Sequence, residues 1–186
     1  VVAFVSSAVA ETKTWVGKTQ QNTGMWHASR DANWSPSGAP KDGDDIVFDA
    51  TSAAGNNCYW DLDITPASWT QTSDFTKTVT FRTEFEEYDG TAPKFVKITG
   101  DVALNGGKWT HVKLGNVYDI LRQYRLYFVI GGNLTVGADA TITAEGLGYT
   151  WYYNAISGGK ASVSSGGAVG GSHGGLGSWM KNVDDP

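Results

Sequence analysis

The stretch Gly100-Asp101-Val102-Ala103-Leu104-Asn105-Gly106 returns in altered form as Gly132-Asn133-Leu134-Thr135-Val136-Gly137, 32 residues further along the chain. Each copy has a Gly followed by Asn or Asp, then three residues that favour a strand, and then a turn. Repetition of one strand-turn unit is typical of a solenoid, in which each coil buries its inward residues against the next coil. The repeat therefore predicts an all-β solenoid.

Short runs of the same kind are spread along the rest of the chain. They are rich in β-branched and aromatic residues and are bounded by Gly, Asn or Asp, which favours strands joined by turns. Because a sandwich can also reuse a strand-turn unit, a β-sandwich with a Gly-rich tail is the alternative fold. We expect strands at Asp45–Asp49, Thr78–Phe81, Phe95–Ile98, Val102–Leu104, Trp109–Leu114, Leu126–Ile130, Leu134–Val136 and Ala140–Ala144.

The composition agrees with an all-β protein and argues against nucleic acid as a partner. Gly is the commonest residue, with 24 copies, and the 186 residues include eight Trp and eight Tyr. The formal net charge is −5 and there are no Lys/Arg runs, so the sequence offers no clustered cations for a phosphate backbone. The length suits one folded domain.

The first ten residues form an apolar stretch that has two interpretations. The small-residue pattern Ala8-Val9-Ala10 resembles the end of a secretory signal peptide, which indicates an exported protein. If the stretch is retained, it suits a strand that adds to the sheet edge of a neighbouring subunit, and its assembly residues are then Val1, Val2, Phe4 and Val5. In either case it is too short to span a membrane.

Changes in composition divide the chain into four parts. After residues 1–10, residues 11–45 form a Trp-rich segment that we expect to cap the fold, and residues 46–157 form the body of strands. Residues 158–186 are rich in Gly and Ser, which is typical of a flexible linker or of a long ordered loop. Within the body, Gly115–Arg125 interrupts the strands and predicts a protruding loop.

Several motifs resemble those of large bacterial surface proteins of the autotransporter-like β-helix class. The resemblance rests on Trp26 with Asp31-Ala32-Asn33-Trp34-Ser35, on Gly38-Ala39-Pro40, on Gly43-Asp44-Asp45-Ile46-Val47-Phe48-Asp49, and on the Gly-rich stretches 132–136, 141–149 and 171–175. It implies a right-handed parallel β-helix with a Trp-rich N-terminal cap and Gly-rich C-terminal loops, located outside the cell. It brings no catalytic residues, and it implies that the chain is the first portion of a longer protein.

The sequence shows no local signature of a catalytic site. His27, His111 and His173 are far apart, and neither a His-Glu-x-x-His motif nor a nucleophile elbow is present. Carboxylates gather at 42–45, 61–63, 84–87 and 184–185, where we expect them to serve turns and solvated faces. We expect no cofactor; Ca²⁺ is the one ion that such oxygen ligands suit, although no run matches a known Ca²⁺ loop.

Two further features concern side-chain chemistry. Cys58 is the only cysteine, so an intrachain disulfide is excluded, and its neighbours Tyr59 and Trp60 predict a buried, unreactive thiol. Tyr149, Trp151, Tyr152 and Tyr153 form the densest aromatic group, which predicts a contact site for a ligand or another subunit.

These features predict a secreted or cell-surface structural protein that is not an enzyme. We expect a self-assembling filament, matrix or surface-layer module whose main partners are other copies of itself. The alternative is a carbohydrate-binding adhesin domain that grips a cell-surface glycan with Trp151, Tyr152, Tyr153 and the loop at 115–125. A polysaccharide lyase or hydrolase is the third hypothesis, and it rests on fold analogy alone.

Overall fold

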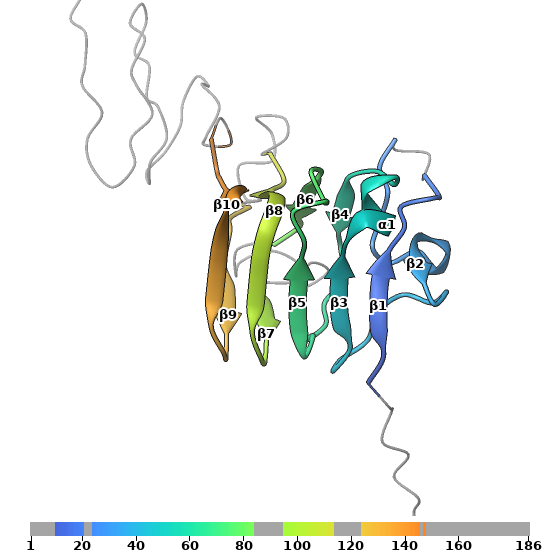
Figure 1. Cartoon of the computed structure of the whole chain (residues 1–186), viewed down its shortest axis with the longest axis horizontal. Coiled ribbons are helices and arrows are strands. Elements are labelled where there is room, and N and C mark those ends of the chain that lie inside the picture. Colours follow the sequence, from blue (N-terminus) through green and yellow to red (C-terminus); the bar gives the residue numbers. More distant parts are fainter. Residues whose placement is uncertain (1–9, 21–23, 84–94, 114–123, 146, 148–186) are drawn as a thin grey trace, which may run out of the picture.

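The computed structural model describes residues 10–20, 24–83, 95–113, 124–145 and 147 (Figure 1). Strands dominate this part of the chain, and its helical content is one short α-helix and one turn of 3-10 helix. The strands are β1 (Thr12–Trp15), β2 (Trp34–Ser35), β3 (Asp45–Phe48), β4 (Cys58–Trp60), β5 (Ser68–Gln71), β6 (Thr78–Phe81), β7 (Val96–Ile98), β8 (Val102–His111), β9 (Phe128–Ile130) and β10 (Leu134–Ile142); α1 spans Ala50–Ala53.

Strands of successive coils pair in parallel, and the pairing measures the length of each coil. Lys13 pairs with Ile46, Ile46 with Trp69, Trp69 with Val102, and Val102 with Leu134, so paired residues of the stacked strands are 33, 23, 33 and 32 residues apart in the sequence. The 32-residue repeat of the sequence is therefore one coil, and the predicted solenoid is confirmed. The protein is a parallel β-solenoid of about 3 turns with a buried aromatic cluster, and the β-sandwich alternative is wrong.

The coils present three faces. The first face holds β1, β3, β5 and the first parts of β8 and β10; the second holds β4, β6 and the second parts of β8 and β10. The third face consists of β7 and β9. Figure 1 shows the first face as a row that runs from β1 to β10, with β7 and β9 beside β8 and β10 at the far end.

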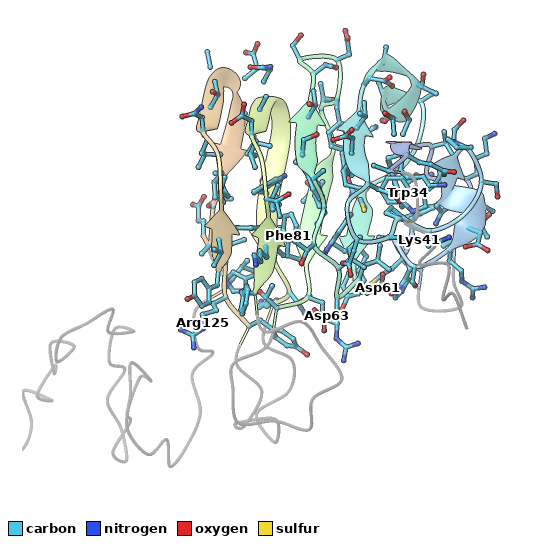
Figure 2. The ribbon with its side chains drawn as sticks, turned by 90° about the horizontal axis from the view of Figure 1, so that it is seen from below. Trp34, Lys41, Asp61, Asp63, Phe81 and Arg125 are labelled. Atoms are coloured by element: carbon cyan, nitrogen blue, oxygen red, sulfur yellow. The ribbon has the colours of Figure 1, made fainter. Side chains whose placement is uncertain are left out.

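Alternation along the strands sends every second side chain into the interior, as the burial patterns of β3 and β6 show. Aromatic rings fill this space. The ring centroids of Trp60 and Trp69 are 4.7 Å apart, and those of Trp69 and Trp109 are 5.3 Å apart, both pairs edge to face. Such pairs add about 0.5–1.5 kcal/mol each beyond the area that they bury. Phe81 lies inside this column, and Trp34 lies near its N-terminal end (Figure 2).

One polar side chain is built into the aromatic column. Gln71 is fully buried in β5, and its Oε1 accepts hydrogen bonds from the indole Nε1 of Trp69 at 3.2 Å and of Trp109 at 2.7 Å. Its Nε2 donates to the carbonyl oxygen of Gly106 at 2.7 Å. A single amide therefore satisfies two buried indole groups and one backbone carbonyl. By contrast, Nε1 of Trp60 has no acceptor among the described residues.

The solenoid turns its corner within the single strand β8, where the pairing with β10 shifts register between Val136 and Asp139. The sequence predicts two strands here, at 102–104 and at Trp109–Leu114, but the structure joins them into one strand. Gly106 and Gly107 explain the difference, because a Cβ on Gly106 would lie 2.6 Å from the carbonyl oxygen of Thr72 in the preceding coil. Gly107 has a φ of +71°, a conformation that glycine adopts freely.

Three parallel strands were not expected from the sequence: β1, β4 and β5. β5 alternates outward Ser68 and Thr70 with inward Trp69 and Gln71. A buried glutamine in the inward position hides the usual alternation of apolar and polar residues, so the strand is not evident from hydrophobicity.

Candidate functional site

The N-terminal end of the solenoid is closed. β2 pairs antiparallel with β1, joining Thr14 to Ser35 and Trp15 to Trp34, and thus covers the outer edge of the first coil. The indole of Trp34 packs edge to face on that of Trp15, with ring centroids 5.1 Å apart. At this end Lys13 is buried, and its Nζ forms an ion pair with Glu11 at 2.7 Å.

Buried polar groups hold this covering segment in place. The amide of Asn33 donates to the carbonyl oxygens of Thr19 and His27, both at 3.0 Å, and its Oδ1 accepts from the Thr19 N–H. The indole of Trp34 donates to the carbonyl oxygen of Ala28 at 2.7 Å. These bonds fix the segment that covers the edge of the first coil at Thr14 and Trp15, where a further strand would otherwise pair.

The last described coil has no such cover among the described residues. β10 pairs with β8 on one side, and no described strand pairs with its other side. An edge strand of this kind presents a row of backbone N–H and C=O groups that can pair with another chain. In Figure 1 β10 forms the end of the row opposite β2.

The side chains of β10 show how much is left uncovered. Leu134, Val136 and Ile142 stand in register with Val102, Leu104 and Trp109 of the preceding coil. The residues of the preceding coil are each 1% exposed, whereas Leu134 and Val136 are 47% exposed and Ile142 is 39% exposed. We call Leu134, Val136 and Ile142 the open face. The columns of side chains that form the core one coil earlier thus end in β10 with apolar side chains that have no further strand beside them among the described residues.

The third face of the solenoid adjoins this open face. Phe128 and Ile130 of β9 are partly buried against the core, and Phe128 packs on Trp109 with ring centroids 4.6 Å apart. The outward side chains of the same strand region, Tyr127 and Val129, are exposed. On β9 the side chains that continue the core are therefore Phe128 and Ile130, whereas Tyr127 and Val129 point away from it.

The site residues expected from the sequence lie outside the described residues. This holds for Val1, Val2, Phe4 and Val5, for Tyr149, Trp151, Tyr152 and Tyr153, and for most of the loop at 115–125. The sequence did contain a signal for the open face, because the second copy of the repeat has Leu134 and Val136 in the inward positions. This pattern predicts a strand, but it does not show that the strand lies at the edge of the described sheet.

Asp42 and Asp44, two of the acidic residues expected to serve turns, accept hydrogen bonds from backbone N–H groups. Asp44 is buried and accepts from the backbone N–H groups of Glu11 and Lys41, and Oδ1 of Asp42 accepts from the N–H of Thr65 at 2.6 Å. Among the described residues, no group of three or more His, Cys, Asp or Glu side chains is placed to hold a metal ion.

Asp61 joins two side chains of a neighbouring segment. Its Oδ2 lies 2.7 Å from Nδ1 of His27 and accepts from the hydroxyl of Ser29 at 2.8 Å. In a catalytic triad the carboxylate orients the histidine, and the histidine contacts the nucleophile. Here the serine hydroxyl donates to the carboxylate itself, so the cluster fastens the segment 27–29 to the residues that follow β4.

The thiol of Cys58 is buried, as the sequence predicts. It lies in β4 and is 1% exposed. Burial raises the pKa of Cys58 well above its ordinary value, and the negative charge of Asp61 raises it further. A protonated, enclosed thiol is a poor nucleophile.

No helix in the described ranges combines the length and apolar character needed to cross a bilayer. Comparison with protein families, with curated proteins and with solved structures finds no match for this chain.

Proposed function

We propose that the protein is a non-enzymatic structural module that assembles with a second copy of itself through the open face. The observation that carries the proposal is the contrast between Val102, Leu104 and Trp109, each 1% exposed, and their half-exposed counterparts in β10. Side-chain positions that are buried in the preceding coil are therefore exposed to water in β10.

The energetics favour cover by another polypeptide. Full burial of a Leu, Val or Ile side chain contributes about 1.5–3 kcal/mol, so covering the remaining half of three such side chains contributes a few kcal/mol. The nine residues of β10 add backbone hydrogen bonds if a strand pairs with this edge.

A pair of open faces is the simplest assembly. Two copies related by a two-fold axis present identical surfaces to each other, and such isologous contacts are the commonest in homo-oligomers. The closed N-terminal end supports a pair over a head-to-tail stack, because β2 and Trp34 cover the edge that a stacked copy would need. A filament then needs a second contact, for which Val1, Val2, Phe4 and Val5 remain the residues expected from the sequence.

The proposal includes the setting implied by the resemblance to bacterial surface proteins: a right-handed β-helix that is secreted or held at the cell surface. Right-handed winding is supported by a general rule, since crossover connections between parallel strands of one sheet are right-handed in about 98% of cases. The solenoid fold and the signal-like N-terminal stretch support the setting.

Sedimentation velocity over a wide concentration range tests the proposal. We expect a reversible monomer–dimer equilibrium for the intact chain. Val136→Lys places a charge in the open face and should shift the equilibrium strongly towards monomer, because a buried lysine without a partner is costly.

Val129→Lys is the matched control, since Val129 is 40% exposed on β9 but points outward from the third face. It should leave the equilibrium unchanged. An intact chain that stays monomeric at every concentration contradicts the proposal, and so does a dimer that Val129→Lys weakens and Val136→Lys does not.

A further inference from the structure

A pocket of about 310 Å³ lies on the second face of the solenoid, away from the open face. Its size is at the lower end of the range for small-molecule sites. Tyr59 and Thr80 form its floor, since they are paired outward residues of β4 and β6. The lining residues are Gly24, Met25, Trp26, Asn57, Cys58, Tyr59, Thr80, Val112 and Lys113, and we call this the lateral pocket.

The aromatic part of the lateral pocket is held rigidly. The N–H of Tyr59 donates to the carbonyl oxygen of Trp26, and the N–H of Ala28 donates to the carbonyl oxygen of Tyr59, both at 2.8 Å. The ring of Tyr59 packs on that of His27, with centroids 4.8 Å apart. Trp26 and Tyr59 are each only partly buried, so part of each side chain stays accessible to a ligand.

The hydrogen bonds of Asp61 also fix one wall of the lateral pocket. The bonds of Asp61 to His27 and Ser29 fasten the segment that carries Trp26 to the end of β4. A site whose aromatic groups are fixed before a ligand arrives loses less conformational entropy on binding.

The polar groups of the lateral pocket are mainly donors. Oδ1 of Asn57 accepts from the N–H of Thr78 at 3.0 Å, which leaves its Nδ2 to donate. Thr80 points outward between buried Val79 and Phe81, and its hydroxyl both donates and accepts. Lys113 is exposed and has no ion-pair partner among the described residues.

We propose that the lateral pocket binds a sugar ring that carries a carboxylate, as one residue of an acidic polysaccharide. Aromatic side chains offer apolar faces on which a sugar ring packs, and the donors of Asn57 and Thr80 suit its hydroxyl oxygens. Lys113 supplies the charge complementary to a carboxylate. The inference does not depend on the proposed assembly, because no residue of the open face lines the lateral pocket.

Isothermal titration calorimetry with a galacturonic acid trimer, and with cellotriose as the neutral probe, tests the proposal on the full chain. We expect saturable binding of the acidic trimer and weaker binding of cellotriose. Tyr59→Ala should weaken binding of the acidic trimer about tenfold through loss of the aromatic face. Lys113→Gln should weaken binding of the acidic trimer and leave that of cellotriose unchanged.

Tyr127→Ala is the matched control, because it removes an exposed tyrosine of the third face that is 48% exposed. It should bind like the unaltered chain, and near-ultraviolet circular dichroism checks that each variant is folded. Absence of saturable binding, or binding that folded Tyr59→Ala retains in full, overturns the site. Equal binding of both probes, unaffected by Lys113→Gln, overturns the acidic ligand.

Discussion

At the scale of single residues, the core depends on a few polar atoms placed among aromatic rings. Gln71 accepts from two indole groups at once, so its loss leaves two buried donors without an acceptor. Cys58 is enclosed by the same core and keeps its proton. We therefore expect changes at Gln71, and the titration of Cys58, to alter the free energy of unfolding.

Gln71→Leu should lower the free energy of unfolding by about 2–6 kcal/mol, since it leaves two buried indole donors without an acceptor and each costs about 1–3 kcal/mol. Urea unfolding followed by tryptophan fluorescence measures the change. A comparison of Trp109→Phe with Trp60→Phe isolates the indole bond, because Nε1 of Trp109 donates to Gln71 and Nε1 of Trp60 has no acceptor among the described residues. Trp109→Phe should cost more, and equal costs contradict this account.

Cys58 should make stability fall at alkaline pH. The pKa of its thiol is raised in the folded protein, so the folded chain keeps the proton above the pH at which the unfolded chain loses it. The contribution is present below the unfolded pKa and is lost as pH rises above about 8.5, at up to about 1.4 kcal/mol per pH unit.

Unfolding of the intact chain and of Cys58→Ala at neutral and alkaline pH isolates this effect from other titrating groups. The decline with pH should be shallower in Cys58→Ala. Parallel declines in the two proteins contradict the assignment.

At the scale of elements, the sequence predicts a strand best where its side chains alternate between apolar inward and polar outward positions and a turn residue marks its end. The repeat at residues 100–106 and 132–137 predicts coil length because equivalent turns stack on each other. The pairing of Asp101 with Asn133 shows this, since Oδ1 of Asp101 accepts from the Asn133 N–H at 2.7 Å. β5 was missed because Gln71 occupies a core position, which only the three-dimensional packing reveals.

The corner of β8 allows a test of glycine by position. Gly107→Ala should destabilise the protein by more than about 2 kcal/mol, because its φ is +71° and a Cβ would lie 2.7 Å from the carbonyl oxygen of Lys77. Gly43→Ala meets a φ of +83° but open space, so about 1 kcal/mol is expected. Thermal unfolding of both variants measures the difference, and equal losses contradict a role for close packing at the corner.

At the scale of the whole molecule, the two ends of the described solenoid differ in how they are covered, and no single residue reveals this. The sequence shows that Leu134 and Val136 alternate inward, but whether a coil lies beyond them depends on the stacking of the complete chain. The apolar or aromatic content of residues 1–5 and 149–153 is visible in the sequence, whereas the open face is evident only when the burial of equivalent residues is compared between coils.

The difference between the ends should appear in amide hydrogen exchange. In a solenoid each coil is stabilised by its neighbours, so protection should be highest in β5 and β8 and lowest in β10. Exchange measured by mass spectrometry at low and high protein concentration should show β10 gaining protection when the protein associates. Protection of β10 equal to that of β5 at low concentration contradicts an uncovered edge.

Coils of unequal length show where residues can be inserted into the chain. The coil that starts at Ile46 has 23 residues, whereas the next has 33, yet Trp69 stays in register with its neighbours on both sides. The shorter coil passes from the end of β4 to the start of β5 through residues 61–67 alone. The length of this corner can therefore differ from coil to coil without a change of register on the first face. An insertion here that keeps Asp61 and Thr65 with their partners offers a way to display a foreign peptide on the solenoid.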